Sequence, residues 1–254
     1  MNAITIFRKE LISYYRSPIA YGVMAFFALI TGYFFYIAVA YFVQIGIQSS
    51  MMGQSQPMSV NDSVIQPVLS NISVIGLFMI PMMTMRLFAE EKRTGTIELL
   101  VTSPITDWEI ILGKWLAALV LYASMLGLSL LSIATLFLYG SPDWRPMLVG
   151  YLGLLLQGGS LLAIGTFIST CTRNQIVAGV AGFSVSLLLW VLNWVSSFQD
   201  SAAAKVVAYM SVLQHFESFA RGVLDSKDIL YYLSAIFIGL FLTGRSLESL
   251  RWRA

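Results

Sequence analysis

Long apolar runs without charge constrain this chain more than any other feature. Because a bilayer core about 30 Å thick takes roughly 20 residues of α-helix, each run of that size predicts a membrane span. Hydrophobic residues make up 57% of the chain and charged residues only 11%, too apolar a balance for a water-soluble surface. The sequence therefore predicts an all-α integral membrane protein with one transmembrane domain over residues 1–254. The six predicted spans are residues 18–43, 71–88, 115–139, 147–169, 176–196 and 229–243.

The distribution of Lys and Arg predicts the orientation. With six spans both termini share a side, and that side holds eleven of the 15 basic residues, against four (Arg145, Lys205, Arg221 and Lys227) on the other. Basic residues accumulate in cytoplasmic flanks, so we expect a plasma-membrane protein with both termini in the cytoplasm. The outer loop from Gln44 to Ser70 then carries no Lys or Arg. A net charge of +2 gives no argument for a nucleic-acid partner.

Residues 1–17 have the pattern of an amphipathic interfacial helix. Ser17 and Pro18 then turn the chain into the first span. Such a helix should lie in the membrane surface, the alternative being a solvated tail. On a helical wheel, one face carries Ile4, Phe7, Leu11, Tyr14 and Tyr15, and the other carries Lys9, Ser13 and Arg16.

The main charge-dense stretch follows the second span. Pro81 should kink this span, and the helix should continue through Arg86 to Arg93. Gly95 should end it in a left-handed conformation, with the basic residues of the last turn complementing the helix dipole. Thr96 can then cap a short helix over residues 97–101.

That short helix is held between two longer ones. It cannot run past Ser103, because the residue before Pro104 is pushed out of helical geometry. Thr106 and Glu109 next form a capping box that opens the third span, whose Lys114 marks the membrane interface. Residues 89–106 are therefore a candidate lever for a cytosolic partner. The alternative is an ordinary loop whose charges pair with one another.

The run RLFAEEKRTGTIELLVTSP at residues 86–104, followed by GKWLAA, resembles permease subunits of ABC transporters of the second export type (ABC-2 family). The N-terminal RKEL and RSP match as well, and the chain is most similar to six-span permeases associated with bacterial gliding motility. The resemblance implies a coupling helix that seats in a separate ATP-binding cassette subunit, a lesser contact at Arg173, and two permease copies forming the pore. The implied coupling residues are Glu90, Glu91, Lys92, Arg93, Gly95, Thr96, Glu98, Leu99 and Pro104.

The residues themselves agree with a separate ATPase. The chain contains no G-x-x-x-x-G-K-[ST] motif, so ATP and Mg²⁺ should bind on the partner, and no cofactor is expected in this chain. The single Cys171 excludes an intrachain disulfide and a cysteine-based metal cluster, and the single His215 cannot build a metal site by itself. No predicted span carries Asp, Glu, Lys or His, which disfavours ion-coupled transport.

Two further segments carry patterns with open alternatives. Ala178, Gly182 and Ser186 recur every four residues on the fifth span, a small-residue stripe that allows close helix approach. The resemblance implies a dimer seam between the first and fifth spans, while intrachain packing is the alternative for the stripe. Residues 197–228 should form outer helices, either re-entrant as in the family or amphipathic on the surface.

The expected function is thus a permease subunit of an ATP-driven exporter. One alternative is a non-transporting membrane component of a motility or envelope machine. A second is an intramembrane hydrolase in which Ser160, after Gly158 and Gly159, would be the nucleophile and His215 the base. That alternative is weak, because nothing in the sequence brings His215 to Ser160.

Overall fold

The computed structural model describes residues 2–51, 59–97, 105–140, 142–198, 206, 207 and 209–251. Within these ranges the chain is helical and contains no strand, which confirms the predicted all-α fold. Its elements are α1 (Asn2–Arg16), α2 (Pro18–Met51), η1 (Asn61–Ile65), α3 (Gln66–Thr84), α4 (Ala89–Thr94), α6 (Asp107–Ala134), α7 (Leu136–Tyr139), α8 (Trp144–Cys171), α9 (Gln175–Phe198), α11 (Val212–Ala220) and α12 (Ser226–Arg251).

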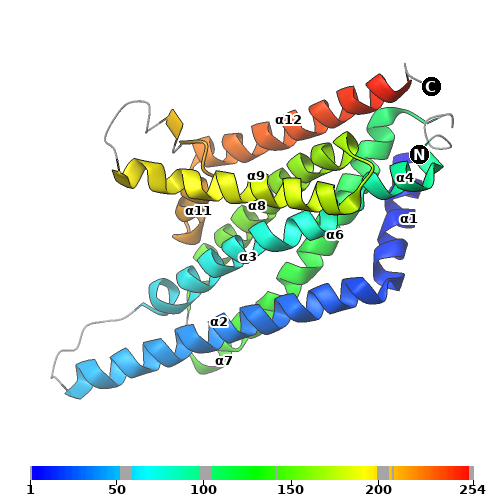
Figure 1. Ribbon diagram of the computed structural model, residues 1–254. Coiled ribbons are helices and arrows are strands. Elements are labelled where there is room, and N and C mark those ends of the chain that lie inside the picture. Colours follow the sequence, from blue (N-terminus) through cyan, green and yellow to red (C-terminus); the bar gives the residue numbers. More distant parts are fainter. Residues whose placement is uncertain are drawn as a thin grey trace.

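Six helical segments are long and apolar enough to cross a membrane, as predicted. Both chain ends and α4 lie at one end of the bundle, which we call the terminal end, and α7 and α11 lie at the opposite end (Figure 1). The six segments are Pro18–Met51, Asn61–Thr94, Asp107–Tyr139, Trp144–Cys171, Gln175–Leu192 and Ser226–Ser249.

The helices are longer than the apolar runs from which they were predicted. The outer loop expected at residues 44–70 is largely helical, because α2 continues to Met51 and helix resumes at Val60. Extending an existing helix requires no new nucleus, so residues such as Gln44 and Ser49 join α2 although they are polar. The hydroxyl of Ser49 donates to the Ile45 carbonyl within that helix, at 2.9 Å.

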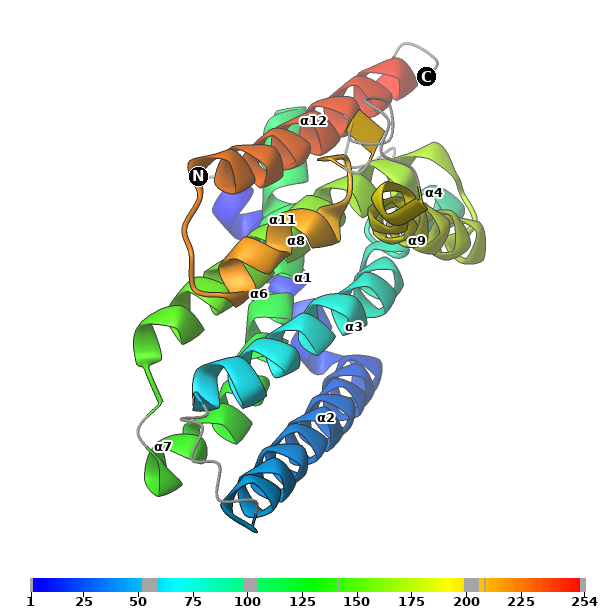
Figure 2. The same cartoon turned by 90° about the vertical axis from the view of Figure 1, so that its left-hand side faces the viewer.

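The second and fourth spans are the most buried, and the first and fifth lie at the edge of the bundle. The most apolar windows of Asn61–Thr94 and Trp144–Cys171 are 72% and 67% buried, whereas those of Pro18–Met51 and Gln175–Leu192 are only 17% buried. α8 contacts both α3 and α12, and Figure 2 shows α2 and α9 at the outside of the bundle. The apolar faces of α2 and α9 are therefore left for lipid or for another chain.

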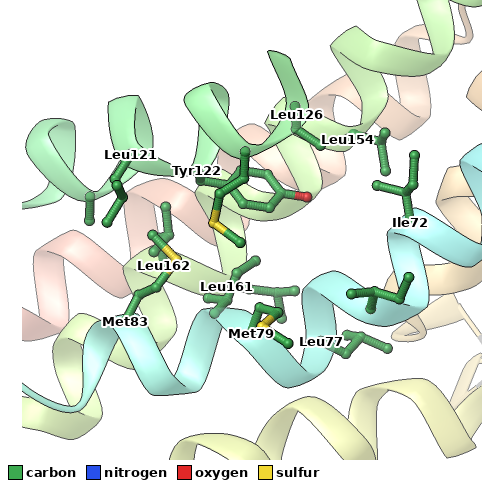
Figure 3. Packing of buried hydrophobic residues seen from close by; sticks show 14 of the residues in the cluster. Ile72, Leu77, Met79, Met83, Leu121, Tyr122, Leu126, Leu154, Leu161 and Leu162 are labelled. Atoms are coloured by element: carbon green, nitrogen blue, oxygen red, sulfur yellow. The ribbon is translucent and has the colours of Figure 1, made fainter. Parts of the chain in front are cut away.

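The central core fills the space between α3, α6 and α8. Tyr122 of α6 belongs to one buried cluster with Leu161 of α8 and Met79 of α3 (Figure 3). Its hydroxyl end lies close to Gly76 of α3, where a Cβ atom would be 3.2 Å from the hydroxyl oxygen. Gly158 lets the helices approach closely, because a Cβ atom there would stand 2.1 Å from Cε1 of Tyr122. A small residue at this crossing is thus required by the ring that packs on it.

The second span differs from its prediction beyond Pro81. The helix was expected to continue to Arg93, but α3 ends at Thr84, and a turn over Met85–Phe88 separates it from α4. Pro81 lacks an N–H group, which weakens the hydrogen-bond ladder just before this break. The break gives α4 its own direction and makes it a separate short element.

Ser169 of α8 stabilises that break. Its buried hydroxyl accepts hydrogen bonds from the backbone N–H groups of Phe88 and Ala89, both at 3.1 Å, and donates to the Met85 carbonyl at 3.4 Å. Backbone groups released by a helix break are costly in an apolar region unless a side chain replaces the lost partners. The end of α8 therefore fixes where α4 begins.

The N-terminal helix and the elbow at Ser17 are present as predicted. α1 packs along α6, with Ile6 against Gly113, where a Cβ atom would come within 2.9 Å of the Ile6 side chain. Tyr15 bonds to Ser124 of α6, whereas Ile4 is 71% exposed and does not belong to the packed face. The membrane-surface position of α1 stays a prediction.

The outer segment contains a packed amphipathic helix. α9 extends to Phe198, and α11 lies against α3, α8 and α9 with its apolar side inward. Phe216 and Phe219 of α11 are almost completely buried. After α11, Gly222 adopts a φ of +78°, a conformation open mainly to glycine, and turns the chain toward α12.

We predict that Gly158→Ala destabilises the bundle by about 1–3 kcal/mol, because the added methyl group would displace the fully packed Tyr122 ring. Thermal unfolding of the detergent-purified protein measures the effect. Gly127→Ala is the matched control, since a Cβ atom at Gly127 has nothing within 4 Å. Equal melting temperatures for the two variants would contradict this packing.

Candidate functional site

The predicted coupling segment is described in part. Gly95 has a φ of +75° and ends α4 in the left-handed conformation, as predicted, and Thr96 and Ile97 are helical again. Glu98, Leu99 and Pro104 lie outside the described residues. The capping box after them is confirmed: the Thr106 hydroxyl accepts from the N–H of Glu109, and the Glu109 carboxylate accepts from the N–H of Thr106 at 3.1 Å.

Two predicted coupling residues of α4 face the protein interior. Glu91 accepts a hydrogen bond from the ammonium group of Lys114 at 2.8 Å, and Lys92 donates to the Thr170 carbonyl of α8. Glu90 and Arg93 are exposed instead. One side of α4 thus holds the element in place, and the other side is available to a partner.

Lys114 is the centre of this arrangement. Its side chain is only 2% exposed, and besides Glu91 it pairs with Glu10 of α1 at 3.1 Å. Its Nζ atom also lies 5.3 Å from the centroid of the Phe88 ring, within range of a cation–π contact. We call Lys114, Glu10 and Glu91 the Lys114 cluster; it joins α6, α1 and α4 through charges.

The electrostatics of the cluster make it a rigid connection. One cation and two carboxylates are largely withdrawn from water, and burial of charges costs several kcal/mol per ion unless partners remain in place. The second oxygen of Glu91 is buried without a hydrogen bond to the described part of the chain. A displacement of α4 must therefore either carry α1 and α6 along or expose unpaired charge.

The remaining coupling residues form one exposed surface at the terminal end. α4 contacts the end of α8 and the start of α9, so Arg173 in the turn between those helices lies near α4. Every member of this surface is exposed in the single chain. We call it the terminal surface: it consists of Glu90, Arg93, Gly95, Thr96 and Arg173.

The small-residue stripe of the fifth span packs within the chain. Ala178, Gly182 and Ser186 are all buried. A Cβ atom at Gly182 would lie 3.5 Å from Cβ of Pro81, so the stripe faces α3. The geometry favours the intrachain alternative for these three residues, while the dimer itself stays a prediction.

The structure also reveals a buried ionisable pair that the sequence did not indicate. His215 lies in the segment predicted to form outer helices. Its Nδ1 is 2.7 Å from Oδ1 of Asp228, and its Nε2 is 2.9 Å from the Tyr209 carbonyl. The Tyr231 ring stacks on it at 3.9 Å. Thirteen residues separate His215 from Asp228, and only the packing of α11 on α12 brings them together.

The hydrogen-bond partners of His215 determine where its hydrogens lie. The Tyr209 carbonyl can only accept, so Nε2 must carry hydrogen, and a second hydrogen must lie between Nδ1 and the carboxylate. His215 therefore has no free nitrogen for a serine. Ser160 donates to the Gln157 carbonyl at 2.7 Å, so the hydrolase alternative lacks its nucleophile–base contact.

Two buried ionisable residues lie near the ends of candidate spans, just outside the spans predicted at residues 115–139 and 229–243. Lys114 is near the terminal end of Asp107–Tyr139, and Asp228 is near the start of Ser226–Ser249. Both are paired, Lys114 with carboxylates and Asp228 with His215. The described residues contain no group of three or more His, Cys, Asp or Glu able to hold a metal ion.

We predict that Lys114→Met destabilises the protein by about 3–5 kcal/mol, because Glu10 and Glu91 are left largely buried without a cation. Adding Glu91→Gln to Lys114→Met should recover part of the loss. Thermal unfolding in detergent measures both variants. Lys9→Met, which removes a 66% exposed side chain paired with Glu10, is the control and should change little. A Lys114→Met protein as stable as this control would refute the role of the cluster.

Comparison with known proteins places these features in a family. Residues 4–236 match the family described as ABC-2 family transporter protein. In Escherichia coli (strain K12), the chain is 24% identical to the probable multidrug ABC transporter permease YbhR over 63% of this chain and 43% of that protein. It is 27% identical to the probable multidrug ABC transporter permease YbhS of the same strain, over 71% of this chain and 47% of that protein. It is 28% identical to the inner membrane transport permease YhhJ, over 63% of this chain and 42% of that protein.

The chain therefore spans less than half the length of these relatives. The family match, in contrast, covers most of the chain, from the first turn of α1 into α12. It includes the elements that carry the Lys114 cluster and the terminal surface. The protein belongs to the ABC-2 family of transporter proteins.

Proposed function

We propose that this chain is the membrane permease subunit of an ATP-driven ABC exporter in the plasma membrane. Family membership, the six candidate spans and the permease names of the relatives support this proposal. The sequence has no P-loop motif, so ATP and Mg²⁺ would bind to a separate cassette subunit and this chain would be no enzyme. The excess of Lys and Arg at the terminal end supports a cytoplasmic position for both termini.

The terminal surface would receive the ATP-binding subunit. The observation that carries this proposal is the double anchoring of α4: Glu91 binds Lys114, and Lys92 and the Ser169 contacts hold α4 to α8. A push on the exposed side of α4 would reach α1, α6 and α8 through these bonds. Such an element can convert closure of the ATPase into movement of membrane helices.

The permease would act as two copies. α2 and α9 keep wide apolar faces in the single chain, and such faces in a membrane bundle can pack on a second copy as well as on lipid. Most charges of the membrane helices are at the two ends and are paired. A pathway along the remaining apolar surface would suit a lipid-like or weakly polar substrate.

We predict that Gly95→Pro weakens binding of the ATP-binding subunit by about tenfold or more, equal to about 1.4 kcal/mol, because proline cannot adopt a φ of +75°. Gly95→Asn is the matched control and should keep binding, since asparagine tolerates this conformation. Glu98→Arg should act like Gly95→Pro. Co-purification of the tagged permease with the cassette subunit, followed by ATP hydrolysis assays, gives the result.

Glu217→Arg changes an exposed carboxylate on α11, at the opposite end, and should leave both binding and hydrolysis intact. Unchanged binding in Gly95→Pro and Glu98→Arg would refute the coupling surface. Loss of binding in Glu217→Arg as well would mean that the assay reports folding instead of docking.

A second candidate role rests on the resemblance to gliding-motility permeases inferred from the run at residues 86–104, whereas the relatives named above are multidrug and inner membrane transport permeases. In that role the chain would anchor an ATPase that performs mechanical work, and it would transport nothing. Both roles use the same terminal surface, so the coupling test does not separate them. Reconstitution of the permease and its ATPase into vesicles does: ATP-dependent movement of lipid-like or drug-like molecules across the bilayer supports export, and its absence under active hydrolysis supports the anchor.

A further inference from the structure

A cavity of about 80 Å³ lies behind the elbow between α1 and α2. Its walls come from four elements: the end of α1, the start of α2, the end of α3 with the following turn, and the middle of α6. The elbow can be followed in Figure 1, where α1 meets α2. The lining is Tyr14, Ser17, Ile19, Ala20, Val23, Met24, Met82, Met83, Met85, Arg86, Leu121 and Met125.

The interior of the cavity suits a flexible apolar chain. Five of the lining residues are methionines, and the others include Ile19, Val23 and Leu121. Methionine side chains are unbranched and polarizable, so they adapt to apolar groups of varied shape. Among the residues described, no charged side chain other than Arg86 lines the cavity.

The polar groups of the cavity lack partners within the described chain. Arg86 is partly buried, yet it makes no ion pair or hydrogen bond there, because the neighbouring carboxylates Glu10 and Glu91 are bound to Lys114. The hydroxyl groups of Tyr14 and Ser17 likewise make no side-chain hydrogen bond with described residues. Partial desolvation of a guanidinium group costs free energy unless an anion pairs with it. The Arg86 guanidinium can therefore still bind an anion.

A surface hollow with two further basic residues adjoins the cavity. Arg86 lines the cavity itself, whereas Lys9, which pairs with Glu10 at 3.5 Å, and Arg16 belong to the adjoining hollow, which shares Ser17 with the cavity. The cavity lies where the membrane spans meet the terminal end, at the depth of lipid headgroups if the helices cross the bilayer.

From this geometry we propose that the elbow cavity binds an anionic phospholipid. The first methylene groups of one acyl chain lie among the methionines, and the phosphate pairs with Arg86, whose planar fork matches phosphate oxygens. Tyr14 and Ser17 donate hydrogen bonds to the headgroup. The bound lipid would fill the space between α1, α2 and α3, and its binding requires neither nucleotide nor a partner subunit, so the proposal does not rest on the transport function.

The test is photo-crosslinking in nanodiscs with phosphatidylglycerol that carries a diazirine on its acyl chain. We expect labelling of the peptides around Met24 and Met82–Met85. Arg86→Gln should lower that labelling by about tenfold, the change expected when one charge-assisted contact is lost, and Arg86→Lys should retain most of it. Arg8→Gln, at an exposed position on α1, is the charge control and should behave as the native protein.

Steric and lipid controls complete the experiment. Val23→Phe should reduce labelling by filling the cavity, whereas Val43→Phe, on the exposed face of the same helix, should not. Equal labelling by a phosphatidylcholine probe, displacement by oleate as effective as by phosphatidylglycerol, or full labelling of Arg86→Gln would each overturn the proposal. A native melting temperature for Arg86→Gln together with loss of labelling would support it.

Discussion

The contact of Lys114 with Glu10 and Glu91 is the interaction on which the terminal end of this protein depends. It connects three elements that are distant in sequence, through charges that are withdrawn from water. In such surroundings the ions stabilise the fold only together, since each one alone would be a buried charge. The cluster is therefore a rigid connection, because α4 cannot shift by itself without a large electrostatic cost.

The break between α3 and α4 makes α4 a separate element that can move together with the Lys114 cluster. Pro81 weakens the helix, and Ser169 supplies the hydrogen bonds that a continuous helix would have formed. α4 is thereby short, separately oriented and fixed on its inner side, while its outer side stays exposed. An ABC-2 permease needs an element of this kind if the energy of ATP is released on another chain, because force must cross from a soluble subunit into membrane helices.

The rest of the bundle divides into a packed centre and open edges. α3, α6 and α8 interlock closely around Tyr122, and the small residues of α9 are used against α3. α2 and α9 keep their outer faces apolar and uncovered. At the opposite end, His215 and Asp228 tie α11 to α12, so the two ends of the bundle each contain buried ionisable groups with their partners. Movement is thus more easily accommodated at the edge helices than in the centre.

The sequence by itself determined the features that depend on local chemistry. Apolar runs of bilayer length gave the six spans, Gly95 ended α4 because glycine adopts the left-handed conformation most readily, and Thr106 with Glu109 capped α6. Tertiary structure decided what depends on contacts between distant residues. The partners of Lys114 and His215 and the role of Ser169 could not be predicted, because the free energy of burying a polar group depends on what the fold places beside it.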